Sequence, residues 1–166
     1  HMLLEALVDL PSSATENTRL VVVGPGPVDY LDRLKSYCQR HQEQLPQVKW
    51  EGPVWGNEKW SYLQGADLMC LPTHSENFGI VVLETLQVGT PVLTTDTTPW
   101  SFVEAWEAGY VVSPQVGEIR EALSDFYASF NWCCGRRQEL ATKTRDHFEL
   151  PVLGRRYCRL YKSVPY

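Results

Sequence analysis

Short, almost wholly apolar runs recur along the chain, at residues 20–23, 48–50, 68–71, 92–94 and 110–112. Runs without polar alternation are typical of strands that are buried on both faces of a parallel sheet. Between the runs, apolar residues return at intervals of three and four, as at Tyr30, Leu34 and Tyr37, which predicts helices. The predicted helices span residues 2–10, 28–44, 57–65, 80–88 and 99–107. This alternation indicates an α/β fold, with a Rossmann-like parallel sheet sandwiched by helices.

The pattern becomes purely helical from about residue 115, where Ile119, Leu123 and Phe126 share one face. Residues 131–135 are the best candidate for a break between helices, and a last helix is predicted at 152–161. The chain is therefore read as one lobe over residues 1–150 with extra C-terminal helices, followed by a terminal helix in 151–166.

Each predicted strand ends in loop-forming residues. These loops begin at Gly24, Gly52, Pro72 and Asp96. In an open α/β sheet the ligand binds at the carboxyl ends of the strands, so the functional residues are expected in these loops.

Composition narrows the classes of partner and compartment. The 166 residues are 43% hydrophobic and 21% charged, with a formal net charge of −5 and no basic cluster, so nucleic acid is not expected as a partner. No apolar run approaches the roughly 20 residues of a membrane span, and no signal peptide is recognisable, which predicts a cytoplasmic protein. The five cysteines include no CxxC pair, so reduced thiols and no metal site are expected. The adjacent Cys133 and Cys134 are interpreted as packing residues.

The densest signal lies at residues 72–92. A polar loop leads to Gly79 and then to a nearly all-apolar helix, which should be buried. The first N–H groups of such a helix have no partner within it, and the helix dipole adds about half a positive charge there. This arrangement binds a phosphate without a lysine, and Gly79 allows the ligand to approach the backbone.

Two carboxylates flank this site. Glu84 stands within the buried helix, so it must find hydrogen-bond donors, and ligand hydroxyls could supply them. The alternative is that Glu84 lies on an exposed rim or pairs with a lysine. Glu76, in the loop before the helix, is either a ligand-binding residue or an ordinary solvated glutamate.

These residues carry a family resemblance. The segment ENFGIVVLE at residues 76–84, continued by GTPV at 89–92, resembles the paired-glutamate signature (E-x7-E) of the retaining GT-B glycosyltransferases of family four. Supporting matches lie in the order found in that family: VGPGP at 23–27 resembles its first glycine loop, VKWEGPV at 48–54 its base-pocket strand and loop, and ADLMCLPT at 66–73 the strand before the signature. The match spans residues 3–113 and is specific as a set.

The resemblance assigns the donor sugar and its diphosphate to matching positions. It makes Glu76 the catalytic residue, which holds hydroxyls of the donor hexose beside the reacting carbon. It also implies that four residues offer backbone N–H groups to the sugar and the diphosphate. They are Phe78, Gly79, Ile80 and Val81.

The nucleoside is assigned in the same way. The resemblance implies that Glu84 accepts hydrogen bonds from the ribose hydroxyls and that Gly24 lies in the glycine loop of the donor site. Val54 or Trp55 would line the nucleobase pocket, with Leu63 as a further neighbour. The choice among UDP, GDP and ADP stays open, as do the sugar and the acceptor.

A loop, a histidine and the absence of metal-ligand spacing also bear on the function. Residues 96–100, DTTPW, resemble a loop of family members that act on lipopolysaccharide and related surface glycans. The alternative is a helix cap, with Thr97 or Thr98 before Pro99 as the first helical residue. His74 is interpreted as a loop hydrogen-bonding group rather than a catalytic base. No cofactor and no metal are expected, because no cluster has ligand spacing and GT-B enzymes do not need a bound metal.

The resemblance also indicates what the chain lacks. It begins inside the helix that matches Leu3 to Leu10, so the first strand, the arginine and lysine that neutralise the diphosphate, and the N-terminal lobe that binds the acceptor have no counterpart. The expectation is most of a C-terminal donor lobe, which alone catalyses little or nothing and has an open strand edge that favours dimerisation. The terminal helix would cross back to the absent lobe.

The function implied is retaining transfer of a hexosyl group from a nucleoside-diphosphate sugar to a glycan or lipid-linked acceptor, in surface polysaccharide or lipopolysaccharide synthesis. Peripheral association of the full protein with the inner face of a membrane is part of this hypothesis. One alternative is an inactive nucleotide-sugar-binding or interaction module of the same fold. Another is a flavodoxin-like or receiver domain, which would need an acidic cluster where the chain has Gly24 to Pro27.

Overall fold

The structure is a computed structural model that describes residues 1–129 and 134–149. The helices are α1 (Met2–Val8), α2 (Ser12–Thr15), α3 (Val28–Arg40), α4 (Gly56–Gly65), α5 (Ile80–Gln87), α6 (Phe102–Ala105), α7 (Val116–Ser129) and α8 (Cys134–Phe148). The strands are β1 (Arg19–Val23), β2 (Gln47–Gly52), β3 (Met69–Leu71), β4 (Val92–Thr95) and β5 (Gly109–Val112). The predicted helix at 152–161 and residue Cys133 lie outside the described residues.

All five predicted strands and the helices between them are confirmed, with differences at the ends. α3 ends at Arg40 rather than 44, because His41 leaves the helical region at φ −115° and its ring contacts Gln44 at 2.8 Å. α6 begins at Phe102 rather than 99. The single turn α2 was not predicted, since four residues are too few to show a period.

The strands are parallel, as predicted, but their hydrogen bonds form two groups. β1 pairs with β2, and β4 lies between β3 and β5. Among the described residues no strand joins β1 to β3.

Burial on both faces is complete only at β4, where all four residues are buried. The prediction of fully buried strands is wrong for β1 and β2, because Val23 and Lys49, which lie in the predicted runs, are exposed. Alternate residues of β4 face two cores. Leu93 packs with Leu4, Leu7 and Ile119, whereas Val92 packs with a cluster that includes Val82, Leu86 and Trp100.

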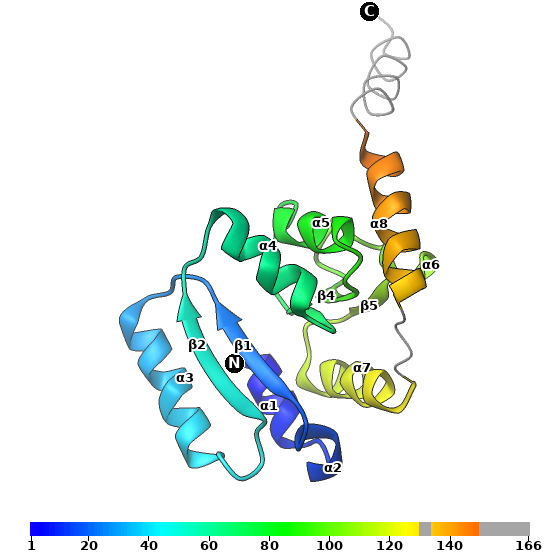
Figure 1. Cartoon of the computed structure of the whole chain (residues 1–166). Coiled ribbons are helices and arrows are strands. Elements are labelled where there is room, and N and C mark those ends of the chain that lie inside the picture. Colours follow the sequence, from blue (N-terminus) through cyan, green and yellow to red (C-terminus); the bar gives the residue numbers. More distant parts are fainter. Residues whose placement is uncertain (130–133, 150–166) are drawn as a thin grey trace, which may run out of the picture.

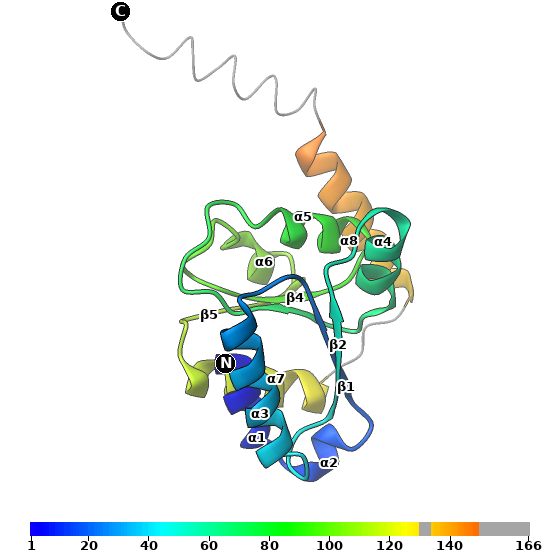
Figure 2. The ribbon, with the colours of Figure 1, turned by 90° about the vertical axis from the view of Figure 1, so that its left-hand side faces the viewer.

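These two cores correspond to two layers of helices. Figure 2 shows α5, α6 and α8 on one side of β4 and β5, and α1 and α7 on the other. α3 lies beside the β1–β2 pair, and α4 follows β2 toward α5 (Figure 1). No helix in the described ranges is long and apolar enough to cross a membrane.

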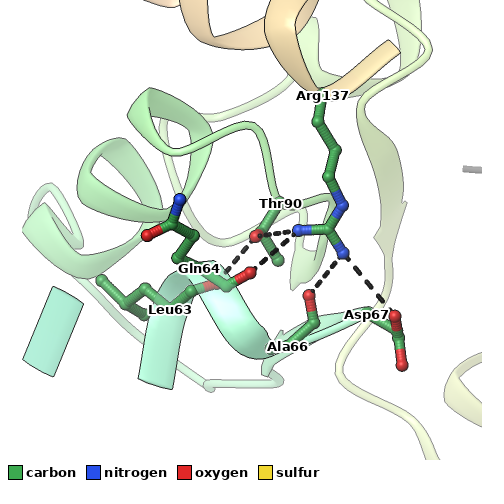
Figure 3. A network of polar contacts seen from close by, with 6 residues as sticks. All are labelled: Leu63, Gln64, Ala66, Asp67, Thr90 and Arg137. Carbon is green, nitrogen blue, oxygen red and sulfur yellow. Dashed lines mark hydrogen bonds and ion pairs between the residues drawn. The ribbon is translucent and has the colours of Figure 1, made fainter. Parts of the chain in front are cut away.

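Arg137 of α8 fastens this helix to the end of α4 and the start of β4 (Figure 3). Its guanidinium donates to the carbonyls of Gln64 and Ala66 at 3.1 and 2.7 Å and to the Thr90 hydroxyl at 3.0 Å. The Thr90 hydroxyl in turn donates to the Leu63 carbonyl at 2.7 Å. One side chain thus satisfies oxygens at the C-terminus of α4, where helical carbonyls lack partners.

Replacement of Arg137 by Met should lower the free energy of unfolding by about 2–3 kcal/mol, because partly buried oxygens lose a charged donor. The matched control is Arg136→Met on the same helix, which breaks a more exposed ion pair with Glu107. That change should cost about 1 kcal/mol or less. Urea unfolding of both variants measures the difference, and equal losses would contradict this role of Arg137.

A second prediction concerns Tyr110 of β5, whose hydroxyl donates to Asp125 of α7 at 2.8 Å. Burial, and then the bond to Asp125, raises the pKa of Tyr110 from 10.0 to about 12. A pKa that is raised in the folded state contributes stability that is complete below pH 10.0 and is lost as the pH rises toward about 12. The thermal midpoint of Tyr110→Phe should therefore fall less steeply than that of the wild type across this range, and parallel curves would refute the assignment.

Candidate functional site

The loops that follow β1 and β2 meet through their backbones. The Gly24 N–H donates to the Gly52 carbonyl at 2.8 Å. Gly24 has φ 133° and open space where a side chain would be, so a ligand can approach its backbone. The predicted glycine loop is thus open and tied to the loop that leads to Trp55.

The loop after β3 ends at the start of α5. Gly79 is the N-cap residue, with φ 70° in the left-handed region, and its carbonyl accepts the Val82 N–H at 2.8 Å. Within the described part of the chain, the four predicted N–H groups have no hydrogen-bond acceptor; they belong to Phe78, Gly79, Ile80 and Val81. The start of α5 therefore presents the free donors that the sequence predicted, while their binding of a diphosphate stays a prediction.

Glu76 is exposed in this loop. Its Oε1 accepts the N–H of the next residue, Asn77, at 3.0 Å. A Cβ placed on Gly79 would lie 3.2 Å from Glu76 Cγ, so the side chain passes directly beside the helix start. The structure thus brings Glu76 and Gly79 together.

Glu84 lies one turn into α5 and forms an ion pair with Lys59 of α4, with Nζ and Oε1 2.6 Å apart. Their side chains are 18% and 33% exposed, respectively. Of the alternatives weighed for Glu84, the lysine pair is what the structure contains. The ribose role stays a prediction.

Lys59 is a residue that sequence reasoning missed. It lies in the polar helix α4, and its ammonium also stands over the ring of Trp60, 5.3 Å from the centroid. No periodicity links α4 to Glu84, so only the packing of α4 beside α5 could identify this partner.

The candidates for the nucleobase pocket differ in exposure. Trp55 is 74% exposed, and Val54 is half-buried, so both can meet a ligand. Leu63 is buried among core residues, which makes it a support for this region rather than an open surface. Phe78 and Ile80 add exposed apolar side chains at the start of α5.

The cap interpretation of residues 97–99 is wrong. α6 begins at Phe102 with Ser101 as its N-cap residue. The Thr98 hydroxyl donates instead to the Thr95 carbonyl at 2.7 Å, and the Thr97 hydroxyl to the Thr73 carbonyl at 3.0 Å. The hydroxyls of this loop therefore bind the end of β4 and the loop after β3 rather than a helix end.

The remaining chemistry near the site is limited. His74 is exposed, and its ring lies 6.3 Å from that of His1. Burial raises the pKa of the Cys70 thiol to about 12, so this cysteine is protonated at neutral pH and is a poor nucleophile. The described residues contain no group of three or more His, Cys, Asp or Glu that could hold a metal ion.

The Lys59–Glu84 pair can be measured by a double-mutant cycle of Lys59→Met and Glu84→Gln. Because both side chains are more than half buried, we expect a coupling free energy of about 0.5–1 kcal/mol in urea unfolding. The control cycle uses Arg120 and Asp9, which are 3.7 Å apart and more exposed, and should give a smaller value. A coupling no larger than in the control would show that Glu84 does not depend on Lys59.

Comparison with known proteins agrees with this geometry. Residues 1–145 match the family model described as glycosyl transferases group 1. The chain is 28% identical over 155 residues to the lipopolysaccharide glucosyltransferase WaaG of Escherichia coli K12, covering 89% of this chain and 39% of that protein. It is 33% identical over 97 residues to a D-inositol 3-phosphate glycosyltransferase of Xylanimonas cellulosilytica, covering 55% and 21%.

Solved structures show the same fold. The crystal structure of WaaG superposes with a TM-score of 0.67 at 26% identity, over 90% of this chain and 38% of that one. Anabaena HepE in complex with UDP superposes with a TM-score of 0.75 at 19% identity, over 99% and 45%. The chain thus spans less than half the length of these relatives, and it has the Rossmann-like C-terminal lobe of GT-B glycosyltransferases. It belongs to the group 1 glycosyl transferases.

Proposed function

We propose that this chain is the donor-binding lobe of a retaining hexosyltransferase that uses a nucleoside-diphosphate sugar. The observation that carries the proposal is the free helix start at Gly79, with Glu76 on one side and Glu84 one turn further along α5. A nucleotide sugar has the same order of groups, because its diphosphate lies between a hexose and a ribose.

The diphosphate would bind at the N–H groups of Gly79, Ile80 and Val81. These donors and the helix dipole supply positive potential without a basic side chain. The same groups would stabilise the charge that develops on the departing diphosphate, which is where transfer needs electrostatic support. We therefore propose no metal and no further cofactor for this lobe.

The two carboxylates would hold the ends of the donor. Glu76, in the loop beside Gly79, would accept hydrogen bonds from the hexose and position its reacting carbon, which makes it the catalytic residue of this lobe. Glu84 lies four residues after the first residue of α5, about 6 Å along the axis, which suits contact with the ribose. Trp55 and Val54 would then line the place of the nucleobase.

UDP-glucose is the first donor to examine. HepE has been solved with UDP-glucose, and WaaG is named a glucosyltransferase. The name of WaaG also supports an acceptor that is a glycan or a lipid-linked glycan of the surface polysaccharide or lipopolysaccharide class. Such an acceptor would bring the whole protein to the inner face of a membrane. Retention of configuration is proposed from the E-x7-E signature, and we expect this chain alone to bind the donor without transferring it.

The test is ligand-observed NMR of the chain with UDP, GDP, ADP and their glucose or mannose conjugates. One nucleotide series should bind, and Glu84→Ala should weaken it by about ten-fold, since a hydrogen bond to a charged group contributes roughly 1.5–3 kcal/mol. The control is Glu121→Ala on the exposed face of α7, which should bind like the wild type.

Three other results of these binding experiments would contradict or narrow the proposal. An absence of binding by every nucleotide at millimolar concentration would overturn the proposal. Equal binding by wild type and Glu84→Ala would remove the ribose role from Glu84. Donor binding by a longer protein that includes the acceptor lobe but forms no glycoside would favour the inactive binding module.

A further inference from the structure

The loop that carries Glu76 is held at both ends by the last residue of β4 and the segment that follows it. At its start, the hydroxyls of Thr95 and Thr97 both donate to the Thr73 carbonyl, at 2.6 and 3.0 Å. At its end, the indole Nε1–H of Trp100 donates to the Phe78 carbonyl. The donor loop is therefore anchored on either side of Glu76 by one neighbouring segment.

Trp100 is placed to act as a rigid anchor. It is 0% exposed and is the largest fully buried side chain among the described residues. Its ring packs against Phe102 and Phe148, with centroids 5.5 and 5.8 Å away, and against Phe78 at 4.9 Å. An indole N–H can only donate, so its position determines where the accepting carbonyl must lie.

This bond controls the direction of a neighbouring N–H group. The Phe78 carbonyl and the Gly79 N–H belong to one peptide group, and no cis peptide bond occurs in the described ranges. In a planar trans peptide these two groups point in opposite directions. Because the carbonyl is directed toward the buried indole, the Gly79 N–H is directed away from it.

Gly79 itself fits this arrangement tightly. A Cβ on Gly79 would lie 3.3 Å from Trp100 Nε1 and 3.2 Å from Glu76 Cγ, and φ is 70°. Left-handed backbone and close contact both favour glycine, so the peptide has little freedom to turn on its own. The direction of the N–H is thus set jointly by the glycine and the indole.

We propose that Trp100 is a positioning residue for the donor diphosphate, whose indole N–H holds the Phe78 carbonyl and so aims the Gly79 N–H at the phosphate. This inference rests on the proposed function of the Gly79 site. It assigns to the loop at 96–100 a task within donor binding, where sequence analysis found only a family likeness or a helix cap. Thr97 helps to anchor the other end of the donor loop, through its bond to the Thr73 carbonyl.

The decisive variant is Trp100→Phe, which keeps an aromatic ring and removes the donor. The control is Trp106→Phe in the same aromatic cluster, whose ring packs on Phe102 and His147. Each protein is titrated with UDP and uridine, GDP and guanosine, or ADP and adenosine, and its fold is checked by thermal unfolding.

Trp100→Phe should bind the diphosphate about ten-fold more weakly while the nucleoside affinity changes by less than about two-fold, because one oriented donor to a charged group is lost. Trp106→Phe should retain both affinities. A purely structural role would weaken nucleoside and diphosphate alike, and that result would overturn the proposal. Thr97→Val, at an exposed position, should give the same phosphate-dependent loss by a smaller factor and serves if Trp100→Phe does not fold.

A measurement without ligand separates this inference from the proposed function. The backbone amide resonances of Gly79 and Ile80 should shift in Trp100→Phe and stay in place in Trp106→Phe. If no nucleotide binds the wild type but these resonances move, the proposed function fails and the anchoring by Trp100 stands. Unmoved resonances, with diphosphate affinity like that of the wild type, would refute the role of Trp100.

Discussion

Buried threonine hydroxyls on and after β4 organise much of this lobe. A hydroxyl in the interior must find a partner, because an unsatisfied polar group costs roughly 1–3 kcal/mol. Thr94 and Thr95 are fully buried, and they find carbonyls on β3 and in the loop beyond it, at Leu71 and Thr73. Because these hydroxyls must have acceptors within the core, their hydrogen bonds fix the position of the loop that carries Glu76.

The same rule operates at the other end of β4. Thr90 is fully buried, donates to the Leu63 carbonyl and accepts from Arg137. Gly89 lies so close to α8 that a Cβ would overlap the backbone of Arg137. α8 is therefore seated on the core by a close backbone approach and by one guanidinium, and its Phe148 reaches the aromatic cluster around Trp100. Core packing and the geometry of the donor site share these side chains.

The site combines rigid and adaptable parts. The start of α5 is fixed by Gly79, Trp100 and the helix itself, whereas Glu76 and Trp55 are exposed. Glu84 is intermediate between the fixed and the exposed residues, because it is partly buried and Lys59 of α4 binds one of its carboxylate oxygens. A charge pair of this kind orients a partly buried carboxylate, and a group that accepts hydroxyl hydrogen bonds must be oriented in this way.

Several features were determined by the sequence alone, because they depend on local periodicity and on one backbone rule. The apolar runs predicted β1 to β5, the helical periods predicted their crossovers, and the run from Gly79 predicted a helix start with free N–H groups. Only the tertiary structure decided which long side chains reach that site. Lys59 and Glu84 are 25 residues apart, and Trp100 and Phe78 are 22 apart. Such contacts follow from how helices and loops pack on the sheet, and no local pattern records that packing.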